Sequence, residues 1–191
     1  MTIIKNHVNK KYKTMTMTKP IAIVGGGPCG LSLARLLHLA NIPFTVFERD
    51  VSSTPESRFQ GGTLDIHPRT GQELLRRAGL HGEFNRFARY DATTVTLQDW
   101  RGGYRQTFGQ DRDAPEIDRV QLRQILLDSL PESSIQWNKG LESVTVDNGQ
   151  PRLKFTDETE ATGFKLLIGA DGAWSKIRSL VRSNTKQKHF Y

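Results

Sequence analysis

Three consecutive patterns of apolar residues predict that Pro20–Asp50 forms a βαβ unit. Ile21–Val24 is a continuous apolar run that ends in glycines, which is typical of a buried parallel strand. Leu31–Ala40 carries apolar residues at helical spacing, and Pro43–Glu48 has the composition of a second strand. Asn41 follows the helix at a position that favours a left-handed backbone.

The rest of the chain predicts further strands, two hairpins and more helices. Strands are expected at Thr63–Ile66, Ser134–Trp137 and, as a buried strand, Phe164–Gly169. Hairpins are expected where Thr93–Asp99 meets Tyr104–Phe108 and where Leu141–Val146 meets Arg152–Phe155. Helices are expected at Thr70–Ala78, Glu83–Ala88, Leu122–Leu130 and from Asp171 through Leu180. The fold class is therefore α/β: a parallel sheet built on the βαβ unit, with a hairpin excursion at Leu141–Phe155.

Charge divides the chain into a body and two tails. The net charge of +7 comes from residues 1–19 and 176–191, which hold five basic side chains each and no acid. Residues 20–175 hold 17 basic and 20 acidic side chains, so this body has no excess of basic charge and no nucleic-acid partner is expected for it. Contact of the tails with RNA or anionic lipid stays open. We expect a basic leader (1–19), one domain (20–182) and a tail (183–191).

Composition narrows the class of protein. Hydrophobic residues make up 36% of the chain and the mean hydropathy is −0.51. No apolar run reaches the roughly 18 residues of a membrane span. The single cysteine, Cys29, excludes an internal disulfide and a multi-cysteine zinc site. It fits a reducing compartment, and we expect a cytoplasmic monomer.

The glycine turn after the first strand has the GxGxxG pattern through Gly25, Gly27 and Gly30. The first glycine permits the tight turn, the second allows close approach of a pyrophosphate, and the third lets the helix pack near the sheet. The helix N-terminus that follows offers unpaired N–H groups to phosphates. Glu48 ends the next strand, 18 residues past Gly30, where a carboxylate can bind ribose hydroxyls and repel a 2′-phosphate. The pattern predicts a dinucleotide site and does not distinguish FAD from NAD.

A second strand–turn–helix pattern surrounds Asp171 and Gly172, within the segment Leu166–Arg178. On physical grounds this aspartate is either a helix cap or part of a second phosphate-binding turn.

Together these motifs resemble the group A flavoprotein monooxygenases, which share the p-hydroxybenzoate hydroxylase-like fold. The glycine turn and the GADGxxSxxR segment (Gly169–Arg178) carry that resemblance. Val46–Asp50, Gly61–His67 and Glu116–Leu127 are, more specifically, similar to segments of the tetracycline-inactivating flavin monooxygenases, in the same order. The resemblance runs from about Pro20 to Val181. It implies a Rossmann-like FAD-binding fold of the glutathione reductase and p-hydroxybenzoate hydroxylase type, with FAD as cofactor and NAD(P)H as co-substrate.

The resemblance also implies roles for individual residues. Glu48 would bind the FAD ribose, with Arg49 beside the adenosine; Arg58 matches an arginine associated with NADPH. Asp65 and Arg119 match residues that contact FAD, and the Asp171–Gly172 turn is a motif associated with both cofactors.

Some of these residues have alternative readings. Arg123, one helical turn beyond Arg119, is a candidate phosphate ligand near a helix start. Arg58, Asp65 and Arg123 could instead form surface or structural pairs. His67 is interpreted as structural, and no residue is assigned as a chemical catalyst or metal ligand.

The resemblance implies an NAD(P)H-dependent hydroxylase of an aromatic or polyketide-like small molecule. Such an enzyme continues into a substrate domain, so this chain is expected to be its C-terminally incomplete FAD-binding part. Two alternatives remain: an inactive FAD-binding remnant, and another FAD- or NAD-linked oxidoreductase.

Overall fold

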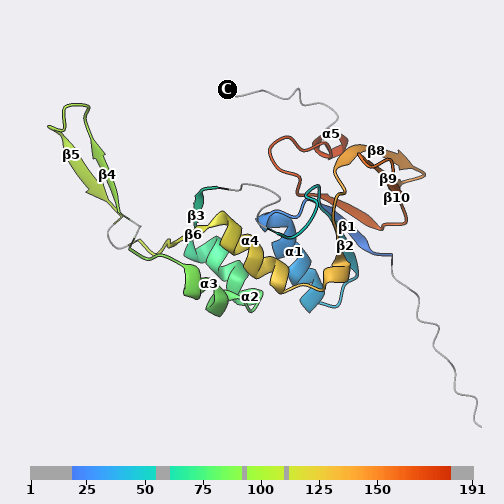
Figure 1. The fold of residues 1–191 in the computed structure, drawn as a ribbon, viewed down its shortest axis with the longest axis horizontal. Coiled ribbons are helices and arrows are strands. Elements are labelled where there is room, and N and C mark those ends of the chain that lie inside the picture. Colours follow the sequence, from blue (N-terminus) through green and yellow to red (C-terminus); the bar gives the residue numbers. More distant parts are fainter. Residues whose placement is uncertain (1–18, 55–60, 92–93, 110–111, 182–191) are drawn as a thin grey trace, which may run out of the picture.

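A parallel four-stranded sheet forms the centre of the fold in a computed structural model that describes residues 19–54, 61–91, 94–109 and 112–181 (Figure 1). Its strand order is β11-β1-β2-β7. The strands are β1 (Ile21–Val24), β2 (Phe44–Phe47), β7 (Ile135–Gln136) and β11 (Leu166–Gly169). Ile21 lies opposite both Phe44 and Leu166 in the register. The predicted parallel sheet is confirmed.

Helix α1 (Pro28–Leu39) connects β1 to β2 and packs beside α4 (Arg119–Asp128) on one face of the sheet. It begins three residues before the predicted start, because Pro28 is well suited to the first helical position. The predicted left-handed residue after the helix is confirmed, since Asn41 has a φ of 54°.

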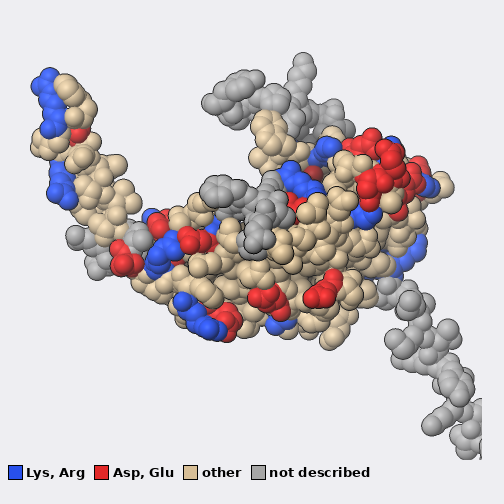
Figure 2. All heavy atoms as spheres, in the orientation of Figure 1, with Lys and Arg blue, Asp and Glu red and all other residues tan. Residues whose placement is uncertain are grey.

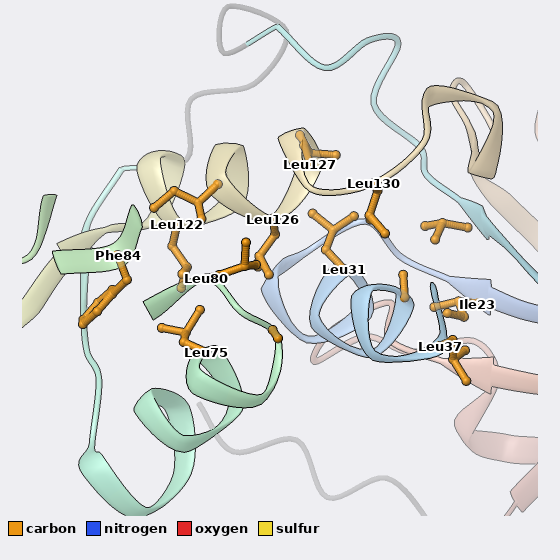
Figure 3. Close-up of a cluster of buried hydrophobic side chains, with 14 of the residues drawn as sticks. Ile23, Leu31, Leu37, Leu75, Leu80, Phe84, Leu122, Leu126, Leu127 and Leu130 are labelled. Atoms are coloured by element: carbon orange, nitrogen blue, oxygen red, sulfur yellow. The ribbon is translucent and has the colours of Figure 1, made fainter. Parts of the chain in front are cut away.

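A hydrophobic core fills the space between these two helices, the sheet and two short helices, α2 (Glu73–Arg77) and α3 (His81–Phe87). Figure 3 shows its side chains converging from all four helices and from β1. A single π-helical turn, η2 (Pro68–Gln72), precedes α2, so the predicted helix over Thr70–Ala78 is divided into two types of turn.

The opposite face of the sheet is covered by a three-stranded antiparallel sheet, β8 (Leu141–Asp147), β9 (Gln150–Phe155) and β10 (Glu160–Ala161). Phe47 lies between the two sheets, with its ring centroid 4.9 Å from that of Phe155. Ile21 and Ile23 join the helix-side core, whereas Ala22 and Val24 join this second core. Strand β1 is therefore buried on both faces, as its continuous apolar run predicts.

Two smaller strand pairs complete the fold. Strand β3 (Thr63–Asp65) pairs antiparallel with β6 (Glu116–Asp118), directly before α4. The predicted first hairpin is confirmed as β4 (Val95–Gln98) and β5 (Arg105–Phe108), which projects from the body (Figure 1). All eight of its strand residues are exposed, and basic side chains gather at its outer end (Figure 2).

Two sequence predictions near the end of the chain are wrong. Strand β11 is not buried: Leu166 is 49% exposed, because among the described strands β11 pairs with β1 alone and lies at the edge of the sheet. The helix expected from Asp171 is a loop, and α5 begins only at Arg178 (Arg178–Val181).

A short 3₁₀ turn, η3 (Glu132–Ser134), precedes β7. No helix in the described ranges is both long and apolar enough to cross a membrane.

Candidate functional site

A cleft of about 750 Å³ opens at the carboxyl ends of the parallel strands. Residues that follow each of the four strands line it: Gly25 after β1, Glu48 after β2, Lys139 after β7 and Ala170 after β11. In open parallel sheets, ligands bind at this edge. Of the nine predicted site residues that the structure describes, seven line the cleft, namely Gly25, Gly27, Glu48, Arg49, Arg119, Asp171 and Gly172.

The three glycines of the turn differ in what surrounds them. Gly25 has a φ of 110°, and a Cβ there would lie 2.3 Å from the Ala170 carbonyl oxygen. Gly30 lies beneath the turn, where a Cβ would come within 2.0 Å of the Gly25 carbonyl oxygen. At Gly27, by contrast, φ is −81° and a Cβ would meet no atom within 4 Å. Two of the glycines therefore serve close packing, and the third leaves space on the cleft side.

Helix α1 presents its N-terminus to the same space. Leu31 N–H donates to the Gly27 carbonyl oxygen at 3.0 Å, which is the first bond of the helix. The N–H groups of Gly27, Cys29 and Gly30 precede that bond, and such groups have no partner within their own helix. The first turn of the helix contains no acidic residue, so no side chain of that turn offsets its positive dipole end.

Glu48 is buried, and backbone N–H groups hold its carboxylate. Gly26 N–H donates to Oε2, and Asp50 N–H donates to Oε1 at 3.0 Å. An ionised carboxylate accepts about four hydrogen bonds, so within the described part of the chain each oxygen keeps a lone pair for another donor. Because Glu48 also lines the cleft, it is fixed in place and able to accept hydrogen bonds from hydroxyl groups there.

Arg123 is a second buried charge behind the turn. Its Nε donates to the Gly26 carbonyl oxygen at 3.0 Å, and its Nη2 lies 3.1 Å from Oδ2 of Asp50. Its guanidinium also lies over the Trp137 ring, 5.5 Å from the centroid. Burial and the neighbouring Glu48 carboxylate raise the pKa of Asp50, while Arg123 opposes that rise. The sequence left Arg123 undecided between a ligand-binding and a structural role, and the structure places it beneath the turn.

Among the described residues, four cationic side chains and two carboxylates line the cleft, so this lining suits an anion. The cations are Arg49, Arg119, Lys139 and Lys176. Lys176 Nζ donates to the Leu141 carbonyl oxygen at 2.7 Å, and Lys139 Nζ lies 2.5 Å from Oδ2 of Asp157.

The Lys139–Asp157 pair predicts a pH dependence of stability. Hydrogen bonds from Lys139 and Thr159 lower the pKa of Asp157 to about 2. A carboxylate with a lowered pKa stabilises the fold above its ordinary pKa, and that stabilisation is lost as the pH falls towards 2. We expect Asp157→Asn to lower the melting temperature at pH 6, and the difference from wild type to shrink between about pH 5 and pH 2. A difference that stays constant over that interval would contradict the assignment.

Asp171 does not cap a helix. Its Oδ2 accepts a hydrogen bond from Lys176 N–H at 2.8 Å, closing the loop that replaces the predicted helix. Its Oδ1 is buried and has no hydrogen-bond partner within the described part of the chain. The loop still reaches the cleft through Asp171 and Gly172.

Of the remaining predicted residues, Gly30 is packed below the cleft and Asp65 lies elsewhere. Asp65, on β3, does not line the cleft; it lies 3.6 Å from Arg112 and opposite Glu116 in the strand register. Arg58 lies outside the described residues.

Comparison with known proteins identifies the family. A family model described as "FAD binding domain" matches residues 18–190. The chain belongs to this family.

The relatives of this FAD-binding domain are monooxygenases. Monooxygenase asqM of Emericella nidulans is 35% identical over 180 residues, which are 87% of this chain and 41% of the relative. Monooxygenase penA of Penicillium thymicola is 35% identical over 183 residues, with 89% and 41% covered. The chain thus spans about two fifths of the length of these relatives.

Solved structures share the fold of the FAD-binding domain. HpxO of Klebsiella pneumoniae, in complex with FAD and uric acid, has a TM-score of 0.69 at 24% identity, covering 88% of this chain and 43% of that one. The tetracycline destructase Tet(51) has a TM-score of 0.65 at 23% identity, covering 86% and 42%. The expected fold and family are confirmed.

The cleft fits the ADP half of FAD. The open space at Gly27, the helix N-terminus and the cationic lining suit a pyrophosphate, and the two free lone pairs of Glu48 suit ribose hydroxyls. The unpartnered Asp171 Oδ1 offers one more acceptor for a hydroxyl donor.

The sequence did not single out the second wall of this cleft. Gly140, Leu141 and Thr156 line it from the β8–β9 side. At Gly140 a Cβ would lie 2.9 Å from Thr156 Oγ1, so this glycine keeps the wall close to the sheet. An isolated glycine just before a predicted strand was the available signal.

Proposed function

We propose that this chain holds the ADP half of FAD in the cleft and forms the FAD-binding part of an NAD(P)H-dependent flavin monooxygenase. One observation supports this best: the glycine turn, Glu48 and the Asp171–Gly172 loop, which are far apart in the sequence, line one cleft at the carboxyl edge of the sheet.

Each group has a physical role in this proposal. The N–H groups around Gly27 donate to the pyrophosphate, and Arg49 and Arg119 balance its charge. Glu48 accepts hydrogen bonds from the ribose hydroxyls and disfavours a 2′-phosphate by charge repulsion. Asp171 accepts from a hydroxyl at its unpartnered Oδ1.

FAD, when bound, would supply the redox chemistry: with two electrons from NAD(P)H, one atom of O₂ enters the substrate and the other leaves as water. The residues of this chain bind and orient the cofactor. The names of the relatives support a monooxygenase reaction. HpxO, which shares the fold, is complexed with uric acid, and we propose that the substrate here is likewise a small molecule, aromatic or polyketide-like. The single cysteine supports a reducing compartment, which we propose to be the cytoplasm.

Titration of FAD with the purified 191-residue chain tests the proposal. We expect a saturable change in flavin fluorescence that excess ADP reverses and FMN does not, because FMN lacks the adenosine diphosphate that the cleft is proposed to hold. A chain that leaves flavin fluorescence unchanged, or a complex that FMN displaces as well as ADP does, would rule out this mode of binding. Addition of NADPH to the complex under air then tests the redox activity.

A further inference from the structure

The peptide groups of Gly26 are held from both sides by buried charged side chains. Its N–H donates to Glu48 Oε2, and its carbonyl oxygen accepts from Arg123 Nε at 3.0 Å. Glu48 and Arg123 are 4% and 7% exposed, so both contacts are shielded from water. Gly26 itself is an unspecified position of the GxGxxG pattern, yet it is the residue that these two side chains hold.

The carbonyl contact fixes the direction of the next N–H. The Gly26 carbonyl and the Gly27 N–H belong to one peptide unit, and no cis peptide occurs among the described residues. In a trans peptide the carbonyl and the N–H point in opposite directions. A carbonyl directed at Arg123 therefore directs the Gly27 N–H away from Arg123. Gly27 borders the cleft, where a Cβ would meet no atom within 4 Å.

We propose that Arg123 is a positioning residue that holds the Gly26–Gly27 peptide with its N–H towards the pyrophosphate of the bound cofactor. This inference rests on the proposed function, because it presupposes a pyrophosphate in the cleft. Arg123 touches no ligand itself in this arrangement; it acts from beneath the turn through the Gly26 carbonyl.

An arginine suits this position better than a lysine does. The planar guanidinium donates at the same time to the Gly26 carbonyl and to Asp50, at 3.0 Å and 3.1 Å, and its face lies on Trp137. A lysine ammonium is a compact charge without that fixed fork. Asp50 and Trp137 follow β2 and β7, so Arg123 ties the orientation of the turn to two strands of the sheet and to α4.

The test compares ligands that differ only in their phosphates. We expect Arg123→Lys to weaken ADP binding about tenfold or more and adenosine binding by less than about threefold, measured by displacement of FAD. The matched control is Arg35→Lys, since Arg35 also donates to two backbone carbonyls, those of Ala78 and Ser129, at a distance from the turn. The control is expected to lose stability and to keep the wild-type ratio of ADP to adenosine affinity.

A second measurement needs no variant. In the amide spectrum of the ¹⁵N-labelled wild-type chain, the Gly27 signal should shift on addition of ADP and stay in place on addition of adenosine. An unmoved Gly27 signal in the ADP complex, or an unchanged affinity ratio in Arg123→Lys, overturns the role of Arg123 alone. A wild-type chain that binds no ADP overturns the proposed function and this inference together.

Discussion

Replacing Gly30 with alanine is expected to lower the free energy of unfolding by about 3 kcal/mol or more and to abolish FAD binding. The new Cβ would lie 2.0 Å from the Gly25 carbonyl oxygen and 3.2 Å from the Ala170 Cβ. Neither contact is the end of a flexible side chain, because one atom is backbone and the other is fixed to it. Helix α1 must therefore move away from the turn, and its N-terminal N–H groups move with it. Urea unfolding and FAD titration measure the two effects.

Alanine substitutions at two other glycines distinguish the effect on stability from the effect on FAD binding. Gly82 is the second residue of α3, and a Cβ there would meet no atom within 4 Å. Gly82→Ala should therefore raise stability by up to about 1 kcal/mol through helix propensity and leave FAD affinity unchanged. Gly27→Ala should keep the stability of wild type and weaken FAD binding, because its methyl group enters only the space proposed for the pyrophosphate. If Gly30→Ala were as stable as wild type, the close packing of α1 on the turn would be disproved.

The sequence predicted most accurately the segments whose folding is decided locally. Strand β1 begins and ends where its apolar run does, and β8 and β9 form the hairpin expected between Leu141–Val146 and Arg152–Phe155. Asn148 and Gly149 form its turn. Both residues of that turn have positive φ, as the Asn-Gly signal requires. Such features depend on neighbours in the chain, which a sequence displays directly.

Features decided by distant partners were missed or wrong. The three-residue strand β6 exists because it pairs with β3, and its sequence, Glu-Ile-Asp, carries little periodicity. The apolar run of β11 does not reveal that the strand lies at a sheet edge. The proximity of Asp65 to Arg112, 47 residues further along the chain, was not visible in the sequence either. These outcomes depend on pairing across 40 residues or more, which a local pattern cannot specify.

The site residues also divide into those decided by neighbours in the chain and those decided by distant partners. The glycines of the turn and the acid at the end of the second strand could be predicted from the sequence, because the strand–turn–helix pattern fixes their positions. The role of Arg123 could not be predicted, because its exposed fraction of only 7% and its hydrogen bond to Gly26, 97 positions away, are properties of the packed fold. The residues behind the turn therefore add a constraint that the motif does not contain, namely the orientation of the peptide at its centre.

Glu48 is both a residue of the sequence motif and a buried partner of the packed turn. Its removal is expected to have one of the two largest effects on stability and FAD binding, together with Gly30→Ala. Glu48→Ala leaves the N–H groups of Gly26 and Asp50 buried without their acceptor, which costs about 2–4 kcal/mol of stability. It also removes the proposed acceptor of the ribose hydroxyls, so FAD affinity should fall about 100-fold or more. The isosteric Glu48→Gln keeps one acceptor oxygen and should lose less stability, but about tenfold in affinity.

A competition experiment isolates the charge of Glu48 from its packing. ADP should displace FAD from the wild-type chain far better than ADP carrying a 2′-phosphate does, because the carboxylate repels that group. Glu48→Gln should narrow this preference, whereas the surface control Glu132→Gln should keep it, since Glu132 is exposed in η3. Equal preference in wild type and Glu48→Gln would mean that the carboxylate serves only to hold Gly26 and Asp50. The turn would then be shaped by two buried charges, Glu48 on its N–H side and Arg123 on its carbonyl side, and the ribose would be bound by other groups of the cleft.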